Sequence, residues 1–283
     1  MHLLLLACGD IGTRVGLRML EHGWRVTAAR RQVDALPAAF DRVAVDLLDS
    51  DSVKRLSDIS ADYVLFTPTP TSRSEEGYRQ MFETGLGHIL EHQNRNCLRR
   101  WFMASSTSVY GQNGDDWVDE RSPTRPTAYS GQAVLAAEQA LTDDSDESTV
   151  LRFGGIYGPG RERQLQMVRE GRCSEDGDAF SNRIHSEDCA AAFEHLLLRD
   201  ERGDRVEPCY VAVDNQPTPI GEVQRWLAEQ MGVEYRCAEG SKRRVGSKRC
   251  SNQLLRNSGW TPAYPSYQEG YGEMIRAMYP DEE

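Results

Sequence analysis

The sequence has no long hydrophobic run, no Cys-x-x-Cys pair and no excess of positive charge. Its leucine run Leu3–Leu6 is followed almost at once by Asp10, so it is too short for a membrane span or for the apolar part of a signal peptide. The seven cysteines are odd in number and scattered, which favours free thiols in a reducing compartment over a disulfide framework. We therefore expect a soluble, cytoplasmic protein that does not act at a membrane.

The charge balance limits the partners that the chain can bind. Lys and Arg number 33 against 44 Asp and Glu, which gives a formal net charge of -11. Such a surface repels phosphate backbones, so we expect no nucleic-acid partner and a small-molecule ligand instead. With 39% hydrophobic residues over 283 positions, the chain is long enough for one large domain or two closely joined domains. Any anionic ligand must be held by a few local groups.

The order of apolar segments predicts an α/β fold. We expect short strands at 2–7, 24–29, 42–45, 63–67, 100–104 and 149–153, with helices at 11–21, 75–94 and 129–141 between them. Strands joined by helical crossovers make a doubly wound parallel sheet of the Rossmann type. We place this dinucleotide-binding domain at 1–154, with 185–215 packing onto its edge, and a small mixed C-terminal substrate lobe at 155–184 and 216–283.

A phosphate-binding turn follows the first expected strand. The residues from Ala7 to Gly12 match Gly-x-Gly-x-x-Gly with alanine at the first position. Gly9 lets the backbone approach a pyrophosphate, and Gly12 lets the helix pack on the strand, while Asp10 and Ile11 begin that helix. Because alanine replaces the first glycine, we expect the turn to need no positive φ at Ala7.

Two arginines at the end of the second strand decide the expected cofactor. An NAD site usually places an acidic residue there, whereas this chain has Arg30 and Arg31. Two guanidinium groups suit a 2′-phosphate, so NADP is favoured and NAD is the alternative. Asp46 and Thr67, at the ends of the next strands, complete the expected cofactor site. The competing interpretation is that the arginines belong to a solvated loop.

Further motifs run in a fixed order along the chain. They are Ala104–Gly111 with its Val-Tyr-Gly element, Tyr129, Leu151–Arg161, Asn182–Asp188 and Ser258–Pro262. Together with the glycine motif, they resemble the extended short-chain dehydrogenase/reductase superfamily. Within it the chain is most similar to the NAD-dependent epimerase/dehydratase group, in its YeeZ-type branch. The resemblance implies hydride transfer on a sugar nucleotide or a related carbonyl or hydroxyl substrate.

The resemblance also implies catalytic residues. In that superfamily a Ser or Thr binds the substrate oxygen and a Tyr acts as general acid/base, which points here to Ser106 and Tyr129. A Lys four residues after the Tyr makes the phenol more acidic and holds the cofactor ribose, but this position is Ala133. A phenol without a cation stays protonated at neutral pH, so carbonyl reduction is favoured over reactions that begin with oxidation.

This departure leaves two functional hypotheses open. One is an oxidoreductase or epimerase-like enzyme that uses Ser106 and Tyr129, and the other is a catalytically silent NAD(P)H-binding sensor or scaffold. In the second case Tyr129 is a packing residue of the first helical turn, and Ser106 is a hydroxyl at the end of a strand.

Three remaining features bear on partners and metals. Superfamily members often bind the substrate diphosphate through arginines of the C-terminal lobe, which points to Arg183 or to the basic run Lys242–Arg249. The pattern His88-x-x-Glu91-His92 is typical of a zinc site, but an apolar stripe already defines this helix as a packing element, so we expect no metal. Related proteins often dimerise through the helices expected at 75–94 and 129–141, which implies a homodimer.

Overall fold

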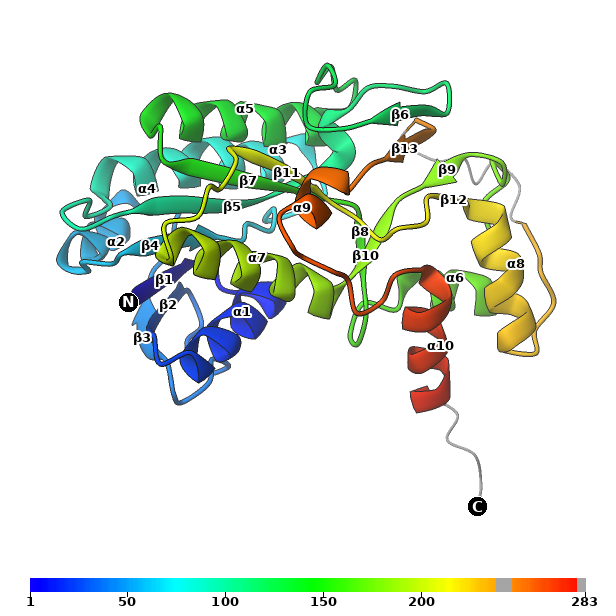
Figure 1. The fold of residues 1–283 in the computed structure, drawn as a ribbon, viewed down its shortest axis with the longest axis horizontal. Helices are drawn as coiled ribbons and strands as arrows, with labels where there is room; N and C mark the ends of the chain where they lie inside the picture. The colour runs from blue at the N-terminus through cyan, green and yellow to red at the C-terminus, as the bar shows by residue number, and fades with distance from the viewer. Residues whose placement is uncertain (238–245, 279–283) are drawn as a thin grey trace. The chain divides into compact units, whose positions relative to one another are not determined.

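The structure is a computed structural model that describes residues 1–237 and 246–278. These residues form two compact units, and Figure 1 gives the labels of their helices and strands. Unit 1 comprises residues 1–109, 126–152 and 190–210, and the described part of unit 2 comprises residues 110–125, 153–189, 211–237 and 246–278. The domain boundaries expected from the sequence stay a prediction, because compactness alone does not show which part folds by itself.

A seven-stranded sheet dominates the fold, with the strand order β11-β7-β5-β4-β1-β2-β3. Its strands are β1 (His2–Leu6), β2 (Arg25–Arg30), β3 (Asp41–Ala44), β4 (Tyr63–Phe66), β5 (Arg100–Ser106), β7 (Ser148–Phe153) and β11 (Cys209–Ala212). The pairings among β1 to β5 are all parallel. Leu3–Leu6 and Tyr63–Phe66 are buried along their whole length, as expected where both faces of a sheet are covered. The predicted doubly wound α/β class is confirmed.

Helices cover both faces of this sheet. In Figure 1, α1 (Asp10–Glu21) and α7 (Ser186–Glu201) lie on one face, and α3 (Glu75–Arg79), α4 (Leu86–His92) and α5 (Tyr129–Asp144) lie on the other. Short helical segments α2 (Ser50–Val53) and η1 (Lys54–Asp58) lie between β3 and β4, and η3 (Thr107–Val109) follows β5. No helix among the described residues is both long and apolar enough to cross a membrane.

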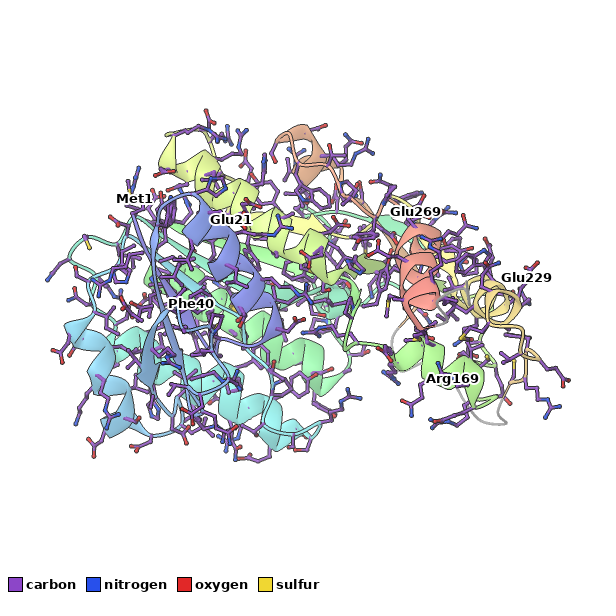
Figure 2. All side chains as sticks on the ribbon, turned by 90° about the horizontal axis from the view of Figure 1, so that it is seen from below. Met1, Glu21, Phe40, Arg169, Glu229 and Glu269 are labelled. Atoms are coloured by element: carbon purple, nitrogen blue, oxygen red, sulfur yellow. The ribbon has the colours of Figure 1, made fainter. Side chains whose placement is uncertain are left out.

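Gly16 explains how α1 lies so close to the sheet. A Cβ on Gly16 would stand 2.5 Å from the Phe40 ring and 2.8 Å from a Leu5 methyl group, so any larger residue would push these side chains aside. Figure 2 labels Phe40 beside α1, whose last residue is Glu21. This close contact packs the middle of α1 against β1.

One predicted helix is interrupted. We expected a single helix over 75–94, but Gln80–Gly85 (η2) is wound as a π-helix between α3 and α4. A wider turn of this kind changes which side chains face the sheet, so helical spacing alone cannot place them. Met81, one of the residues so displaced, lines the pocket described below.

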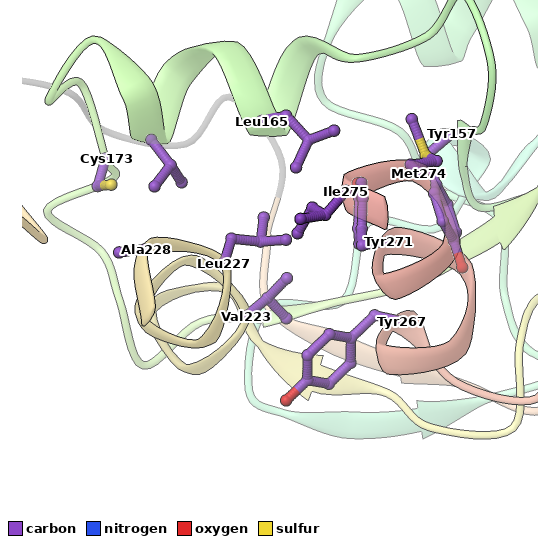
Figure 3. Packing of buried hydrophobic residues seen from close by; sticks show 11 residues of the cluster. Tyr157, Leu165, Cys173, Val223, Leu227, Ala228, Tyr267, Tyr271, Met274 and Ile275 are labelled. Carbon is purple, nitrogen blue, oxygen red and sulfur yellow. The ribbon is translucent and has the colours of Figure 1, made fainter. Parts of the chain in front are cut away.

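Unit 2 has a separate hydrophobic cluster, which Figure 3 shows. Its strands are β6 (Asp116–Val118), β8 (Gly155–Tyr157), β9 (Phe180–Ser181), β10 (Arg183–His185), β12 (Thr218–Pro219) and β13 (Lys248–Cys250). Its helices are α6 (Arg163–Arg169), α8 (Ile220–Gln230), α9 (Gln253–Asn257) and α10 (Tyr267–Met278). Leu165, Leu227 and Tyr271 bring α6, α8 and α10 together in the cluster.

Candidate functional site

The turn between β1 and α1 leaves a helix end open. Gly9 precedes the 12-residue helix α1, and no side chain caps it. The first N–H groups of α1 are therefore available to an anion, and the helix dipole adds positive potential there. A Cβ on Gly9 would meet only the Ala7 carbonyl oxygen, at 3.9 Å, so a ligand can approach the backbone at this point.

Ala7 corrects one expectation from the sequence. Its φ is +54°, in the left-handed region, whereas we expected no positive φ at this position. Side chains with a Cβ adopt this region at a cost of about 1 kcal/mol or more. Thr67 helps to hold the turn, because its hydroxyl donates to the Ala7 carbonyl at 3.4 Å and its N–H donates to the Leu6 carbonyl at 3.1 Å. The turn geometry of the glycine motif is therefore kept without its first glycine.

Gly12 provides the close contact that the motif predicts. A Cβ at this position would stand 3.0 Å from the Thr67 hydroxyl and 3.2 Å from the Cys8 sulfur. Cys8 is buried beneath the turn, and burial raises the pKa of its thiol, an effect partly offset by Thr13 and Arg30. The thiol is therefore protonated and acts as a small packing group.

A cavity of about 460 Å³ opens beside this turn. All of its lining residues belong to unit 1, and all but Met81 lie at or just after the ends of β1, β2, β3 and β4, where ligands bind in open α/β sheets. They are Ala7, Cys8, Gly9, Arg30, Arg31, Gln32, Val45, Asp46, Leu47, Leu48, Thr69, Thr71 and Met81.

Five of the expected cofactor residues line this cavity: Ala7, Gly9, Arg30, Arg31 and Asp46. The other four do not. Ile11, Gly12 and Thr67 are buried behind the turn, and Asp10 forms an ion pair with Arg14 at 2.8 Å. These four residues shape the turn rather than the cavity wall.

The charges in the cavity favour an anion near β2. No ion pair joins the Arg30 or Arg31 guanidinium to any residue in the described part of the chain. Asp46 is the single acidic residue of the lining, and its Oδ1 already accepts the Leu48 N–H at 3.1 Å. A ligand bound here would therefore contact two arginines that form no ion pair and one carboxylate that already accepts a hydrogen bond.

Sequence reasoning missed several lining residues. Gln32 follows the arginines, and Thr69 and Thr71 follow β4. The rule that ligands lie beyond the carboxyl ends of parallel strands could have found these three residues. Met81 gave no such signal, because its position depends on the π-helical segment.

Ser106 lies at the end of β5 within a buried hydrogen-bond network. Its hydroxyl accepts the Ser108 N–H at 3.1 Å, and its own N–H donates to the Ser105 hydroxyl at 2.6 Å. Ser105 in turn donates to Glu138 of α5, and Arg152 of β7 donates to the same carboxylate at 2.7 Å. The end of β5 is therefore fixed against α5 and β7.

Tyr129 begins α5, and its phenol is half-buried. The hydroxyl donates to the Arg73 carbonyl at 2.9 Å, and the ring meets Tyr78 edge-on with centroids 5.7 Å apart. Ser106 and Tyr129 thus lie on elements that touch, since a Cβ on Gly131 in the first turn of α5 would stand 2.4 Å from the Ser108 carbonyl oxygen. Ala133 lies on the same helix, in the position of the family lysine.

Arg183, the expected substrate residue, lies buried in unit 2 with 4% of its surface exposed. Its Nη2 donates to Ser181, its guanidinium lies 5.4 Å from the Tyr267 ring centroid, and its Nη1 has no partner among the described residues. Burial raises the pKa of Asp214 to about 7, and Arg183 partly offsets this shift. The two side chains form a buried polar centre within unit 2.

The basic run is only partly described. Lys242, Arg243, Arg244 and Val245 lie outside the described residues. Lys248 is buried and donates to the Tyr110 carbonyl at 2.9 Å, and the Arg249 guanidinium lies 5.2 Å from the Trp117 and Phe180 ring centroids. These two cations are therefore engaged inside unit 2.

The histidines of the zinc-like pattern bind protein groups. His88 Nδ1 lies 3.0 Å from the Leu47 carbonyl oxygen, and His92 Nε2 lies 3.1 Å from the Ser50 hydroxyl. Within residues 1–237 and 246–278, no group of three or more His, Cys, Asp or Glu side chains is placed to hold a metal ion.

Comparisons with known proteins found relatives that match nearly the whole chain. The chain is 24% identical to the 3-diazoavenalumate denitrifying reductase of a Streptomyces species, over 94% of this chain and 97% of that protein. It is 32% identical to a solved structure from Methylobacillus flagellatus that carries a provisional NAD-dependent epimerase/dehydratase assignment, with a TM-score of 0.84 and 98% of each chain covered.

A more distant solved structure shares the fold. The UDP-glucose 4-epimerase of Thermus thermophilus, solved in complex with NAD, matches with a TM-score of 0.82 at 19% identity, and each chain is covered completely. The model of the NAD dependent epimerase/dehydratase family matches residues 7–211, which include the phosphate-binding turn, Ser106 and Tyr129. The chain therefore belongs to the NAD dependent epimerase/dehydratase family.

Proposed function

We propose that this protein is an NADP(H)-dependent reductase that acts on a carbonyl group of a sugar nucleotide or a related small molecule. The family and the reductase relative support an NAD-dependent oxidoreductase role. The observation that carries the proposal is the cavity beside α1, where an open helix N-terminus and two unpaired arginines occur together.

The residues of the cavity fit a dinucleotide phosphate. The first turn of α1 and the bare backbone at Gly9 suit the pyrophosphate, and Arg30 and Arg31 suit a 2′-phosphate beyond β2. Asp46 adds an acceptor for a hydroxyl or an amino group. The reduced nicotinamide supplies hydride when it is bound.

Ser106 and Tyr129 have the properties that reduction requires. The Ser106 hydroxyl already accepts one N–H, and it can donate its proton to a substrate oxygen. The Tyr129 hydroxyl carries a proton, since it donates to Arg73, and it can transfer that proton to the alkoxide that reduction creates. A protonated phenol suits this direction better than oxidation, because oxidation needs a base.

Turnover tests this assignment. NADPH absorbance is followed with a panel of nucleotide sugars and simple carbonyl compounds, first with the native protein and then with Tyr129→Phe. We expect oxidation of NADPH by at least one class of compound, and a loss of about 10² to 10⁴ in rate for Tyr129→Phe with NADPH binding retained. Equal rates for the two proteins would contradict the role of Tyr129.

A catalytically silent NAD(P)H-binding protein is the second candidate function, and Ala133 is the observation that favours it. If this candidate is correct, the native protein binds NADPH and turns over none of the panel. The variant Ala133→Lys, which restores the family lysine, then creates activity.

A further inference from the structure

Two cysteines of unit 2 face each other across a short β-bridge. Cys173 follows α6 and Cys237 follows α8, and the two residues are direct partners in an isolated parallel bridge. The Cys173 N–H donates to the Arg236 carbonyl at 3.1 Å, which fixes the register of the pair. Neighbouring strands lie about 4.8 Å apart, and directly paired residues point to the same face. The two Cα atoms are therefore within the range of about 4.4 to 6.8 Å that a disulfide spans.

Each thiol lies against the chain that carries the other. The Cys237 Sγ donates to the Ser174 carbonyl at 3.6 Å, so it is next to the residue that follows Cys173. Burial raises the pKa of the Cys173 thiol, the Cys237 thiol raises it further, and a backbone hydrogen bond with Arg236 lowers it. An effect of one thiol on the pKa of another needs a short distance between them. These contacts agree with the bridge in bringing the two sulfur atoms together.

The two cysteines differ in exposure. Cys237 is exposed, whereas Cys173 is fully buried in the hydrophobic cluster of unit 2, where Figure 3 labels it. A dissolved oxidant therefore reaches Cys237 first, because burial shields Cys173 from direct reaction. This division suits an attacking and a resolving cysteine, in which the exposed thiol reacts with the oxidant and the buried thiol completes the disulfide.

We propose that Cys173 and Cys237 form a reversible disulfide on reaction with a small disulfide oxidant such as oxidised glutathione. In the first step the Cys237 thiolate attacks the glutathione disulfide, a mixed disulfide forms, and one glutathione thiolate leaves. In the second step the Cys173 thiolate attacks the Cys237 sulfur, the protein disulfide forms, and the second glutathione thiolate leaves. The two protons from the cysteines go to the two glutathione thiolates, and two electrons pass from the protein to the oxidant.

The disulfide joins the chain after α6 to the chain after α8, and both helices contribute to the same hydrophobic cluster. In a reducing compartment the dithiol is the resting state, and the disulfide forms only as the proportion of oxidised glutathione rises. This modification needs neither cofactor nor substrate, so the inference is independent of the proposed function.

Peptide mass spectrometry tests the proposal on the folded native chain, equilibrated in glutathione buffer and then alkylated. We expect a peptide pair linked through Cys173 and Cys237 that separates on reduction. At about 1 mM reduced glutathione, the linked form is expected to exceed the mixed disulfide at Cys237 about tenfold or more, because the bridge raises the effective concentration of the second thiol. In Cys173→Ser the Cys237 thiol has no resolving partner, so it is expected to remain joined to glutathione.

Cys97→Ser is the matched control, because it removes another exposed thiol, which belongs to unit 1. This variant is expected to form the linked peptide to the native extent. Absence of the linked peptide from the native chain overturns the proposal, and so does a mixed disulfide at Cys237 that is as abundant in the native chain as in Cys173→Ser. The linked peptide is measured in the native chain, so this result depends neither on the folding of a variant nor on NADPH binding or turnover.

Discussion

Two single residues carry local costs that the fold imposes on them. Ala7 adopts a left-handed φ that glycine adopts freely, and Asp214 is an acid buried with little compensation beside Arg183. Neither feature follows from residue type alone, since both depend on how the backbone turns around them. Each one makes a prediction about stability.

Ala7→Gly is expected to stabilise the folded protein by about 1 kcal/mol, because it relieves the left-handed strain at φ +54°. Urea unfolding measures the change. Ala133→Gly is the control, because Ala133 lies in the regular helix α5, where glycine costs about 1 kcal/mol. Destabilisation by both substitutions would show that the turn at Ala7 is not strained.

The raised pKa of Asp214 predicts that the free energy of unfolding depends on pH. Burial raises its pKa to about 7, so the folded state binds this proton more tightly than the unfolded state. Its contribution to stability is complete below about pH 4 and is lost as the pH rises to about 7. Between pH 5 and pH 8 the free energy of unfolding is expected to fall by at least about 1 kcal/mol more in the native protein than in Asp214→Asn. An equal change in the free energy of unfolding between pH 5 and pH 8 in the two proteins would contradict this prediction.

At the scale of secondary-structure elements, α5 connects the proposed catalytic residues to the sheet. Its first turn touches the backbone after β5 at Gly131, and its middle is bound to β7 through the buried ion pair of Glu138 and Arg152. These two anchors hold α5, which begins at Tyr129, against the end of β5 and against β7 more firmly than helix propensity could. The geometry of the site is therefore a property of the contact between α5 and the sheet.

Gly131→Ala tests the first anchor. Its Cβ would stand 2.4 Å from the Ser108 carbonyl oxygen and 2.7 Å from Pro126, so we expect a loss of about 1 to 3 kcal/mol in unfolding free energy. Gly87→Ala in α4 is the matched control, since nothing lies within 4 Å of its Cβ and alanine is the better helix former. We expect Gly87→Ala to be stabilising by up to about 1 kcal/mol. The same change of stability in both variants would argue against close packing at Gly131.

At the scale of the whole molecule, much of the fold could be predicted from the sequence. Continuous apolar runs such as Leu3–Leu6 are buried completely only when both faces of their sheet are covered. In a chain whose strands are joined by helices, these runs therefore predict a parallel sheet with helices on both faces. All six predicted strands occur within two residues of their expected bounds. The π-helical turn at Gln80–Gly85 could not be predicted, because it breaks the spacing on which helix prediction depends.

The candidate site was only partly predictable for the same reason. Gly9 and Arg30 are next to strand ends in the sequence, so their place at the cavity follows from the order of elements. Arg73 meets Tyr129 only because the segment before α3 folds over α5, a contact between residues 56 positions apart. The YeeZ-type branch, the NADP preference and the homodimer stay predictions.

The central claim is that the cavity beside α1 binds NADP(H) through Arg30 and Arg31. Fluorescence titration of the native protein with NADPH and with NADH tests it most directly, alongside the double variant Arg30→Ala/Arg31→Ala and the control Arg25→Ala, whose arginine is exposed and paired with Asp41. We predict that the native protein and the control bind NADPH about tenfold or more tighter than NADH, and that the double variant loses this preference. Binding of neither cofactor, or a preference for NADPH that survives in the double variant, would contradict the account.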